Sequence, residues 1–188
     1  MKKLKEEIDK LKKIAIDLIS EEDHLNAIEY HKRIIGLSKI LNDKFTEAIF
    51  LNNLAIANKK IGNLNEALDI YNNMIKISEG LKNKKNELLT IAYCGAGEIL
   101  SLKGAFNEAY HYYNKSLERS KNTKGFGLKA RIYNNIGLLY LDKGEIEKGK
   151  VWLKDAYTLL EENNLTDTPI GRVIKENIDK AETFINSP

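Results

Sequence analysis

Four stretches of this 188-residue chain resemble one another and recur at a nearly constant spacing. Each stretch has a small residue near its start, and these lie 40, 42 and 40 positions apart: Ala27, Ala67, Ala109 and Gly149. A bulkier residue follows each of them after four positions: His31, Tyr71, Tyr113 and Leu153. Such a period is typical of helical repeats, in which each unit buries its apolar face against its neighbours. The spacing therefore predicts a short array of similar units.

A second helical segment precedes each stretch and carries its own small residue, always twelve positions earlier. These residues are Ala15, Ala55, Gly97 and Gly137. Small residues at fixed points on two segments let the helix axes approach closely. Each unit is therefore expected to be a pair of antiparallel helices joined by a short turn.

Glycine marks the turn inside three of the four units, at Gly62, Gly104 and Gly144. Glycine ends a helix cheaply because it adopts the left-handed backbone conformation without steric cost. The first unit has Ser20-Glu21-Glu22-Asp23 at this place instead. We expect Asp23 and Asn63 to cap the helices that follow them, with Glu66 completing a capping box at Asn63.

The composition agrees with a helical protein and limits the classes of partner that it is expected to bind. Only two prolines occur, Pro169 and Pro188, and 43% of the residues are hydrophobic. The 30 Lys and Arg residues nearly balance the 27 Asp and Glu residues, which disfavours a nucleic-acid partner. The single cysteine, Cys94, excludes a disulfide framework within the chain. Asp17 interrupts the N-terminal apolar run, so we expect neither a signal peptide nor a membrane span and place the protein in the cytoplasm.

The last segment, residues 168–186, is predicted to cap the array. Thr168 and Pro169 form an N-cap followed by a favourable first helical residue. One apolar stripe follows, consisting of Ile170, Val173, Ile174, Ile178, Ala181 and Ile185. A helix with one apolar stripe and one polar face covers the stacking surface that the last unit would otherwise expose.

These features resemble the tetratricopeptide repeat (TPR). The resemblance is carried by Asn53-Leu54-Ala55, by the run from Ile61 to Ala67 and Tyr71, and by the segment Asn135–Tyr140 with Gly144. It covers about residues 4–162, and the 40- to 42-residue units look like the long repeats of kinesin light chains, spindle-orientation adaptors and bacterial peptide-sensing regulators. The resemblance implies an all-α, right-handed superhelical solenoid of four helix pairs plus the capping helix. We expect a single domain over residues 1–188, with units at about 4–42, 44–82, 84–122 and 126–163.

No enzyme motif is found, and we expect neither catalysis nor a cofactor. Gly95-Ala96-Gly97 lies inside a helical pattern, which favours helix packing over a phosphate-binding loop. His24 and His31 share a helix face, but no carboxylate spacing supports a metal site, and His31 stands at the ring position of Tyr71. A nucleophile made by Cys94 and His111 lacks an orienting third group.

The first helices of such an array line its concave side, which is the usual binding face. We predict twelve partner-binding residues there: Lys12, Ile16, Ile49, Asn52, Asn53, Ile56, Lys59, Glu98, Arg131, Asn134, Asn135 and Leu138. The asparagine pairs can donate to and accept from the backbone of an extended peptide. The alternative is that one asparagine of each pair bonds the neighbouring repeat. Of the five-residue carboxylate clamp that some family members carry, only Lys12 and Asn53 match.

The predicted function is that of a non-catalytic interaction module that holds a peptide or helix of a partner protein in the concave groove. One alternative is a structural element that forms a homodimer through its end helices, since the first helix carries Leu4, Ile8 and Leu11. A remote alternative is RNA binding through the tyrosines, which core packing explains better.

Overall fold

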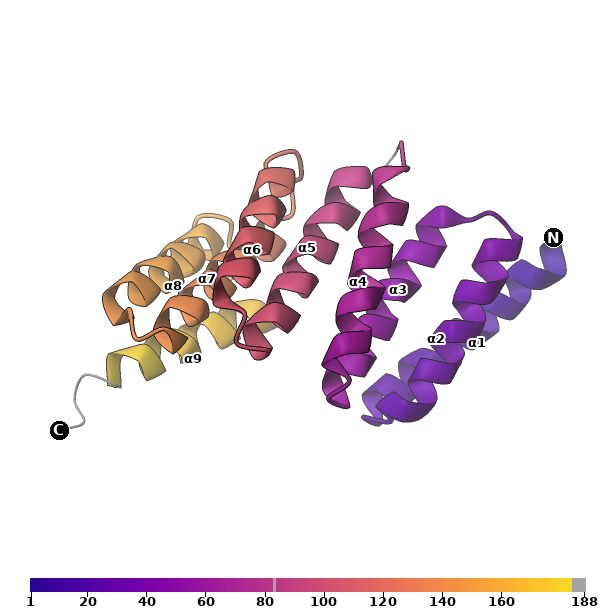
Figure 1. Cartoon of the computed structure of the whole chain (residues 1–188), viewed down its shortest axis with the longest axis horizontal. Helices are drawn as coiled ribbons and strands as arrows, with labels where there is room; N and C mark the ends of the chain where they lie inside the picture. The colour runs from indigo at the N-terminus through magenta and orange to yellow at the C-terminus, as the bar shows by residue number, and fades with distance from the viewer. Residues whose placement is uncertain (83, 184–188) are drawn as a thin grey trace.

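A computed structural model describes residues 1–82 and 84–183, and within them the chain forms nine α-helices and no strand. The helices are α1 (Lys2–Ser20), α2 (His24–Ile40), α3 (Lys44–Lys60), α4 (Leu64–Glu79), α5 (Lys85–Leu102), α6 (Phe106–Ser120), α7 (Phe126–Asp142), α8 (Ile146–Glu161) and α9 (Pro169–Thr183). They stand side by side in a row from one end of the chain to the other (Figure 1). The predicted all-α repeat solenoid is thus confirmed. Ile185 and the predicted end of the last helix at residue 186 lie outside the described residues.

Small residues bring the helices of each pair together, as their spacing predicted. Ala15, Ala27, Ala55 and Ala67 are completely or almost completely buried. In the last pair, a Cβ atom on Gly137 would stand 3.0 Å from the carbonyl oxygen of Gly149. A larger residue at either glycine would push α7 and α8 apart, since buried side chains are already closely packed.

The turns within the pairs share one backbone geometry. Gly62, Gly104 and Gly144 have φ angles of +83°, +74° and +78°, and Glu22 adopts φ +59° at the same place in the first pair. The next N–H after each of them bonds the carbonyl five residues earlier, for example from Asn63 to Asn58 at 2.9 Å. This pattern is the Schellman motif that ends helices in a left-handed residue. Glu22 therefore performs the role of glycine without glycine's freedom.

The two predicted caps have different outcomes. Asp23 is confirmed as a cap, because its carboxylate accepts a hydrogen bond from the N–H of Asn26 at 3.1 Å. The capping box at Asn63 is wrong, since the Asn63 side chain makes no cap bond to the helix that follows it in the described structure. Its backbone N–H already bonds the carbonyl of Asn58, so no donor is left for Glu66.

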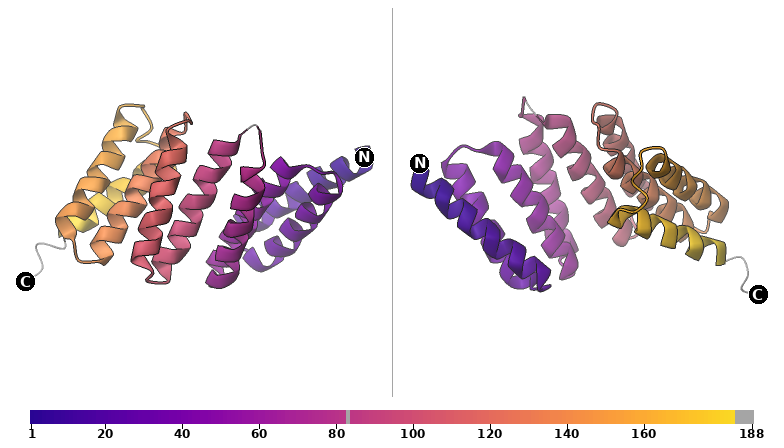
Figure 2. Two further views of the ribbon diagram at one scale, coloured as in Figure 1. Left: turned by 45° about the horizontal axis from the view of Figure 1, so that its top comes forward. Right: turned by 180° about the vertical axis from the view of Figure 1, so that it is seen from behind.

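First helices and second helices occupy different sides of the row. The first helices lie behind the second helices in Figure 1 and face the viewer in the right-hand view of Figure 2. α3 packs against α5 and α5 packs against α7, whereas in the described part of the chain no two of α2, α4, α6 and α8 have closely spaced backbones. A longer side-chain bond, from the hydroxyl of Tyr112 on α6 to Oδ1 of Asn72 at 3.4 Å, links α6 to α4. Closer spacing on one side means that the array curves toward that side. The first helices therefore form its inner face.

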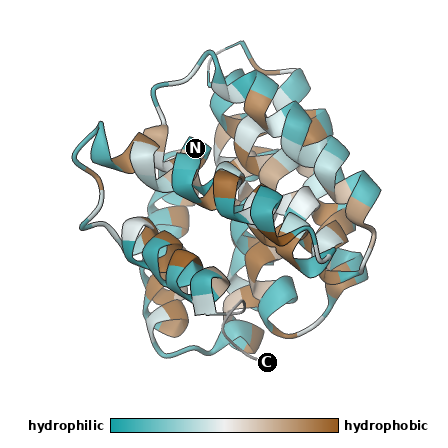
Figure 3. Ribbon diagram, turned by 90° about the vertical axis from the view of Figure 1, so that its left-hand side faces the viewer, coloured by the Kyte–Doolittle hydropathy of each residue, from teal (hydrophilic) through white to brown (hydrophobic). Residues whose placement is uncertain are grey.

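The helix α9 occupies the place of a fifth first helix. It packs against α8 and α7, just as α5 packs against α4 and α3. Its start is capped as predicted, since the hydroxyl of Thr168 accepts from the N–H of Gly171 at 3.3 Å. Apolar and polar residues alternate along the helices when the array is viewed from its C-terminal end (Figure 3).

At the other end of the array, the apolar residues of α1 are used internally. Ile8 and Leu11 are buried and belong to the same core cluster as Ile34 and Ile35 of α2. Ile8 and Leu11 are therefore not available to a second copy of the chain, whereas Leu4, the third residue on which the homodimer alternative was based, is half-buried. The homodimer itself stays a prediction.

Candidate binding groove on the first helices

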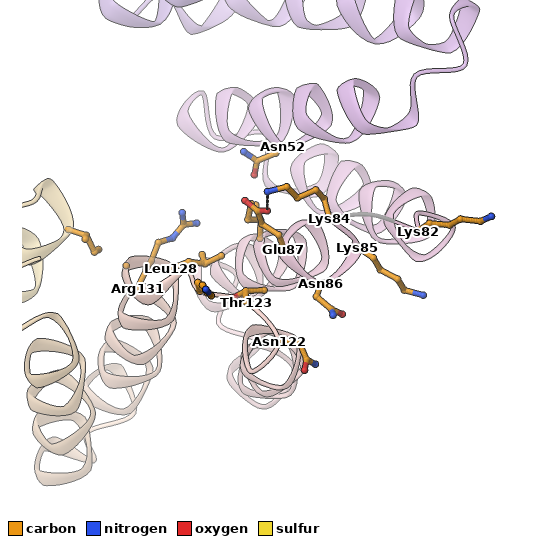
Figure 4. Close-up of a pocket in the computed structure, with 15 residues that line it drawn as sticks. Asn52, Lys82, Lys84, Lys85, Asn86, Glu87, Asn122, Thr123, Leu128 and Arg131 are labelled. Carbon is orange, nitrogen blue, oxygen red and sulfur yellow. Dashed lines mark hydrogen bonds and ion pairs between the residues drawn. The ribbon is translucent and has the colours of Figure 1, made fainter. Parts of the chain in front are cut away.

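A large cleft opens on the inner face of the array and has a volume of about 980 Å³. It lies between α3, the segments that lead into α5 and α7, and the start of α9. Figure 4 shows Lys84 and Arg131 extending toward the open space beside Asn52, while Lys82 and Lys85 point away from Asn52. The residues lining it are Asn52, Lys82, Lys84, Lys85, Asn86, Glu87, Ile91, Asn122, Thr123, Lys124, Gly125, Gly127, Leu128, Arg131 and Ile170.

Cationic residues outnumber acidic ones in the lining of this cleft. Five of its side chains are Lys or Arg and one is acidic. That acid, Glu87, pairs with Lys84 at 2.9 Å, and the pair is half exposed (Figure 4). A cleft lined mainly by one sign of charge attracts groups of the opposite sign. Lys84 and Arg131 are paired with Glu87 and Glu98, so the excess positive charge of the lining comes from Lys82, Lys85 and Lys124.

One carboxylate joins three first helices on the inner face. Glu98 on α5 accepts from Lys59 of α3, with 2.7 Å between Nζ and Oε2. From the other side its Oε1 atom accepts from Arg131 of α7, at 2.7 Å from Nη2 and 2.9 Å from Nε. Asn135 of α7 donates a further hydrogen bond to the same oxygen at 2.9 Å. This arrangement, the Glu98 cluster, ties the second, third and fourth helix pairs together.

Burial and charge oppose each other at Glu98, whose side chain is 15% exposed. Burial alone would raise the pKa of this carboxyl, but the positive charges of Arg131 and Lys59 outweigh it, and the pKa is lowered. Cys94 lies beneath the cluster, with its Sγ atom 3.6 Å from Nδ2 of Asn135. Burial raises the pKa of Cys94 to about 12, so the thiol is protonated and unreactive at neutral pH.

A second, apolar cavity of about 270 Å³ lies near the N-terminal end of the same face. Most of its wall is carbon, and a single charged residue, Lys12, is among the described residues that line it. The His31 side chain is buried in this wall, and neither of its ring nitrogens has a hydrogen-bond partner in the described part of the chain. The lining residues are Lys12, Ala15, Ile16, Ile19, His31, Thr46, Ile49, Phe50 and Asn53.

The two asparagine pairs predicted for the groove differ in their surroundings. Asn52 and Asn53 are half-buried and line the large cleft and the apolar cavity respectively. Asn134 is buried, and its Oδ1 atom accepts from Nδ2 of Asn177 on α9 at 2.8 Å. Asn135 is engaged by Glu98. The alternative reading, a bond to the neighbouring repeat, thus describes the second pair.

The other predicted residues fall into three groups. The first lines a cavity: Lys12, Ile16 and Ile49 line the apolar cavity, and Arg131 lines the large cleft. The second is the Glu98 cluster, in which Lys59 and Glu98 are joined by the same Arg131. Ile56 and Leu138 are half-buried and line neither cavity.

Several lining residues were not predicted from the sequence. Lys82, Lys84 and Lys124 belong to connections between helix pairs and Lys85 is the first residue of α5, all outside the repeat positions that were compared. His31 was assigned to packing, which its burial supports, but its unpaired nitrogens were not foreseen. The sequence did offer one sign that His31 is unusual, because the aligned repeats have Tyr71 and Tyr113 at this position.

Among the residues that the structure describes, two other kinds of site lack the features they would need. No three His, Cys, Asp or Glu side chains there gather in a way that would hold a metal ion. No helix in residues 1–82 and 84–183 is both long and apolar enough to cross a membrane.

Comparison with known families decides the classification. Residues 46–122 match one description of the tetratricopeptide repeat, and residues 130–163 match a second. The chain belongs to the tetratricopeptide repeat family. Together the matches span the second, third and fourth helix pairs of this TPR protein, and the family predicted from the sequence is confirmed. No curated protein sequence matches the chain.

Solved structures with similar folds support the same conclusion. BtubC (BKLC) from P. vanneervenii superimposes with a TM-score of 0.71 at 17% identity, over 96% of this chain and 82% of its own. A point variant of a Podosopora anserina protein, assigned as a kinesin light chain with nearly identical TPR-like repeats, gives 0.71 at 13% identity, over 94% and 85%. A second structure of that protein, without the substitution, gives 0.69 at 13%, over 94% and 86%. At these identities the likeness concerns the fold.

Membership of the family fixes the general character of the protein. TPR arrays are generally scaffolds for protein–protein interaction, and the repeat fold is typically non-catalytic. The same repeat serves many unrelated assemblies, so the partner must be inferred from the surface of this particular array.

Proposed function

We propose that this TPR protein is a non-catalytic interaction module that holds a segment of a partner protein, a peptide or a helix, against the inner face of its array. The observation that carries the proposal is the placement of Asn52 and Asn53 on α3. They are neighbours in sequence, yet one lines the large cationic cleft and the other the apolar cavity. A segment crossing α3 at this point would contact both.

The two cavities supply different parts of the binding energy. The apolar cavity gains affinity from buried carbon surface. The large cleft adds charge complementarity, which speeds association and orients the partner. The asparagine amides between them offer donors and acceptors to a peptide backbone. The partner segment is therefore expected to combine apolar and acidic residues, and we place the interaction in the cytoplasm.

Of the twelve predicted residues, eight form the proposed contact set: Lys12, Ile16, Ile49, Asn52, Asn53, Ile56, Arg131 and Leu138. Four are given a supporting role: Lys59, Glu98, Asn134 and Asn135. Asn134 is covered by α9, and Lys59 and Asn135 each bond Glu98, which also holds Arg131 of the contact set. Substituting these four tests stability before it tests binding.

The experiment is affinity capture from an extract of the native cells with the variant Asn52→Ala/Asn53→Ala. The matched control is Asn107→Ala/Asn114→Ala, which changes two exposed asparagines on α6, a second helix. Both variants should fold like the wild type, as circular dichroism would show. The α3 variant should lose the captured protein at least tenfold, and the α6 variant should retain it.

Two outcomes would contradict the proposal. Equal capture by both variants would remove the inner face of α3 from the binding site. Capture that disappears with ribonuclease treatment would favour the RNA alternative. Sedimentation of the isolated chain tests the homodimer alternative separately, because a dimer would show a mass that depends on concentration.

A further inference from the structure

The junctions between successive helix pairs differ in how closely the helices pack. α6 and α7, which join the third pair to the fourth, lie less closely together than α2 and α3 or α4 and α5 do at the two preceding junctions. α5 also packs less closely against α7 than it does against α3. In the described part of the chain, the junction between the third and fourth pairs is therefore the most loosely packed of the three.

The helix pairs on either side of this junction are themselves tightly packed. α5 approaches α6, and α7 approaches α8, more closely than the helices of the first two pairs approach each other. In the fourth pair, Gly137 and Gly149 allow the close approach. α9 packs against both α7 and α8, and its Asn177 bonds Asn134 of α7 at 2.8 Å. Two rigid bodies thus meet at a loosely packed surface, which is the kind of place where domains and repeats move relative to one another.

The polar contacts across this junction all end on one stretch of α5. Among the described residues, the side-chain hydrogen bonds and ion pairs that reach from α5 or α6 to α7 start from only two residues of α5. Glu98 bonds Arg131 and Asn135, and Cys94 accepts a longer bond from the same Asn135. The polar restraint on the fourth pair is therefore concentrated at the Glu98 cluster on the inner face.

The rest of the junction consists of apolar and aromatic contacts. Ile132 of α7 belongs to one core cluster with Tyr113 of α6, and the rings of Tyr110 and Tyr140 meet edge to face with their centroids 5.9 Å apart. Apolar contact is non-directional, so two such surfaces can tilt slightly against each other. An ion pair in which one guanidinium donates twice fixes both distance and direction. The bonds of Glu98 are therefore the directional restraint on the angle between the two bodies.

The large cleft lies on the boundary between these two bodies. On one side it is lined by residues that precede the junction, among them Asn52 of α3 and Ile91 of α5. On the other side it is lined by Leu128 and Arg131 of α7 and by Ile170 of α9 (Figure 4). Part of the connection between α6 and α7 lines it as well. A change in the angle between the bodies therefore changes the width of this cleft.

We propose that the junction between the third and fourth pairs is flexible, that α7, α8 and α9 tilt across it as one body, and that the Glu98 cluster holds the large cleft at its observed width. Release of Glu98 lets the cleft widen and accept a bulkier segment. The inference rests on the proposed function only in treating the cleft as part of the binding groove, because the motion itself needs no partner.

The test measures distances between pairs of spin labels in the full chain by pulsed electron paramagnetic resonance. The labels are attached at Lys76→Cys on α4, Glu118→Cys on α6 and Thr158→Cys on α8, which are exposed positions 42 and 40 residues apart in equivalent places of their repeats. The pair 118 and 158 reports on the flexible junction, and the pair 76 and 118 reports on the preceding one. The native Cys94 is completely buried and protonated, so it takes no label.

In Glu98→Gln the distribution of distances between residues 118 and 158 should broaden by several ångströms, while that between residues 76 and 118 stays as in the wild type. Glu87→Gln is the matched control, because the same substitution on the same helix removes an exposed pair with Lys84 that does not cross the junction. It should change neither distribution. Asn135→Ala removes one bond to Glu98 but leaves its ion pairs in place, so it should fold even if Glu98→Gln does not, and broaden the same distribution less.

Unchanged distances between residues 118 and 158 in Glu98→Gln and Asn135→Ala would overturn the proposal. Equal broadening at both junctions would also overturn it, because the whole array would then have loosened. If these distances do not respond but the Asn52→Ala/Asn53→Ala variant loses its captured protein, the flexible junction is wrong and the groove stands. If the distances respond as expected and capture is unaffected by that variant, the flexible junction stands and the groove is wrong.

Discussion

The ring of Tyr113 occupies the space in which a side chain at residue 97 would stand: its Cε1 atom is 2.6 Å from the position that the Cβ atom of an alanine at residue 97 would take. Tyr113 is buried on α6 and Gly97 lies inside α5. The contact sets how closely the two helices of the third pair approach. It also explains why a residue with poor helix propensity is found in the middle of a helix.

Gly97→Ala is therefore expected to destabilise the protein by about 1–3 kcal/mol, because the added methyl group must displace a buried ring. Denaturation by urea, followed by circular dichroism, measures the change. The matched control is Gly36→Ala on α2, where a Cβ atom would meet nothing within 4 Å. That variant should be stabilised by about 0.5–1 kcal/mol through helix propensity alone. Equal effects of the two substitutions would contradict the packing role of Gly97.

Glu22→Gly is expected to stabilise the protein by about 1 kcal/mol. Glu22 has φ +59°, a conformation that glycine adopts without the cost a side chain imposes. Glu21→Gly, one residue earlier at φ −87°, is the control and should be neutral or destabilising. Thermal unfolding of both variants measures whether each one is stabilised or destabilised. Stabilisation by Glu21→Gly would refute the explanation.

Glu98→Gln should destabilise the protein by about 3 kcal/mol at neutral pH, because Lys59 and Arg131 lose their shared carboxylate partner. The pKa of Glu98 is lowered in the folded state, so its contribution is present above the pKa of the unfolded carboxyl and is lost as the pH falls through the folded pKa. Glu176→Gln, which removes an exposed pair with Lys180, should have no measurable effect. Chemical denaturation between pH 3 and pH 8 distinguishes the two variants.

His31 should make stability decrease as the pH falls from about 6.5 to about 4. Its folded pKa is about 4, so in this range the unfolded state binds more protons than the folded state. The decrease amounts to at most about 3 kcal/mol. It should be absent in His31→Tyr, which also fills the cavity, and present in His111→Gln, which changes an exposed histidine. A pH profile shared by all three proteins would show that His31 does not titrate in this way.

The repeat made the fold predictable because its residue types determine local structure, namely helix contacts and turns. Ala27 and its counterparts mark close helix contacts, and Gly62, Gly104 and Gly144 mark left-handed turn residues. Glu22 could be aligned with those glycines, but its sequence gives no sign of a left-handed conformation. The capping box at Asn63 failed for a related reason, since the turn itself uses the N–H on which that motif depends.

The candidate site was less predictable because its contacts join distant residues. Lys59 and Arg131 meet at Glu98 across 39 and 33 positions, and Asn177 reaches Asn134 across 43. Repeat alignment placed most of these residues on the inner face but did not reveal which ones bond each other. The lysines near residue 84 belong to a connection between units, where the repeat carries no information.

The neighbours of α1 have a consequence for local unfolding. Its backbone packs closely against α2 alone among the described helices, whereas α3, α5 and α7 each touch another first helix. Its side chains Lys12 and Ile16 face α3 across the apolar cavity. A helix held on one side opens with a smaller free energy than one held on two. Amide protons of residues 2–20 should thus exchange with solvent earlier than those of α5.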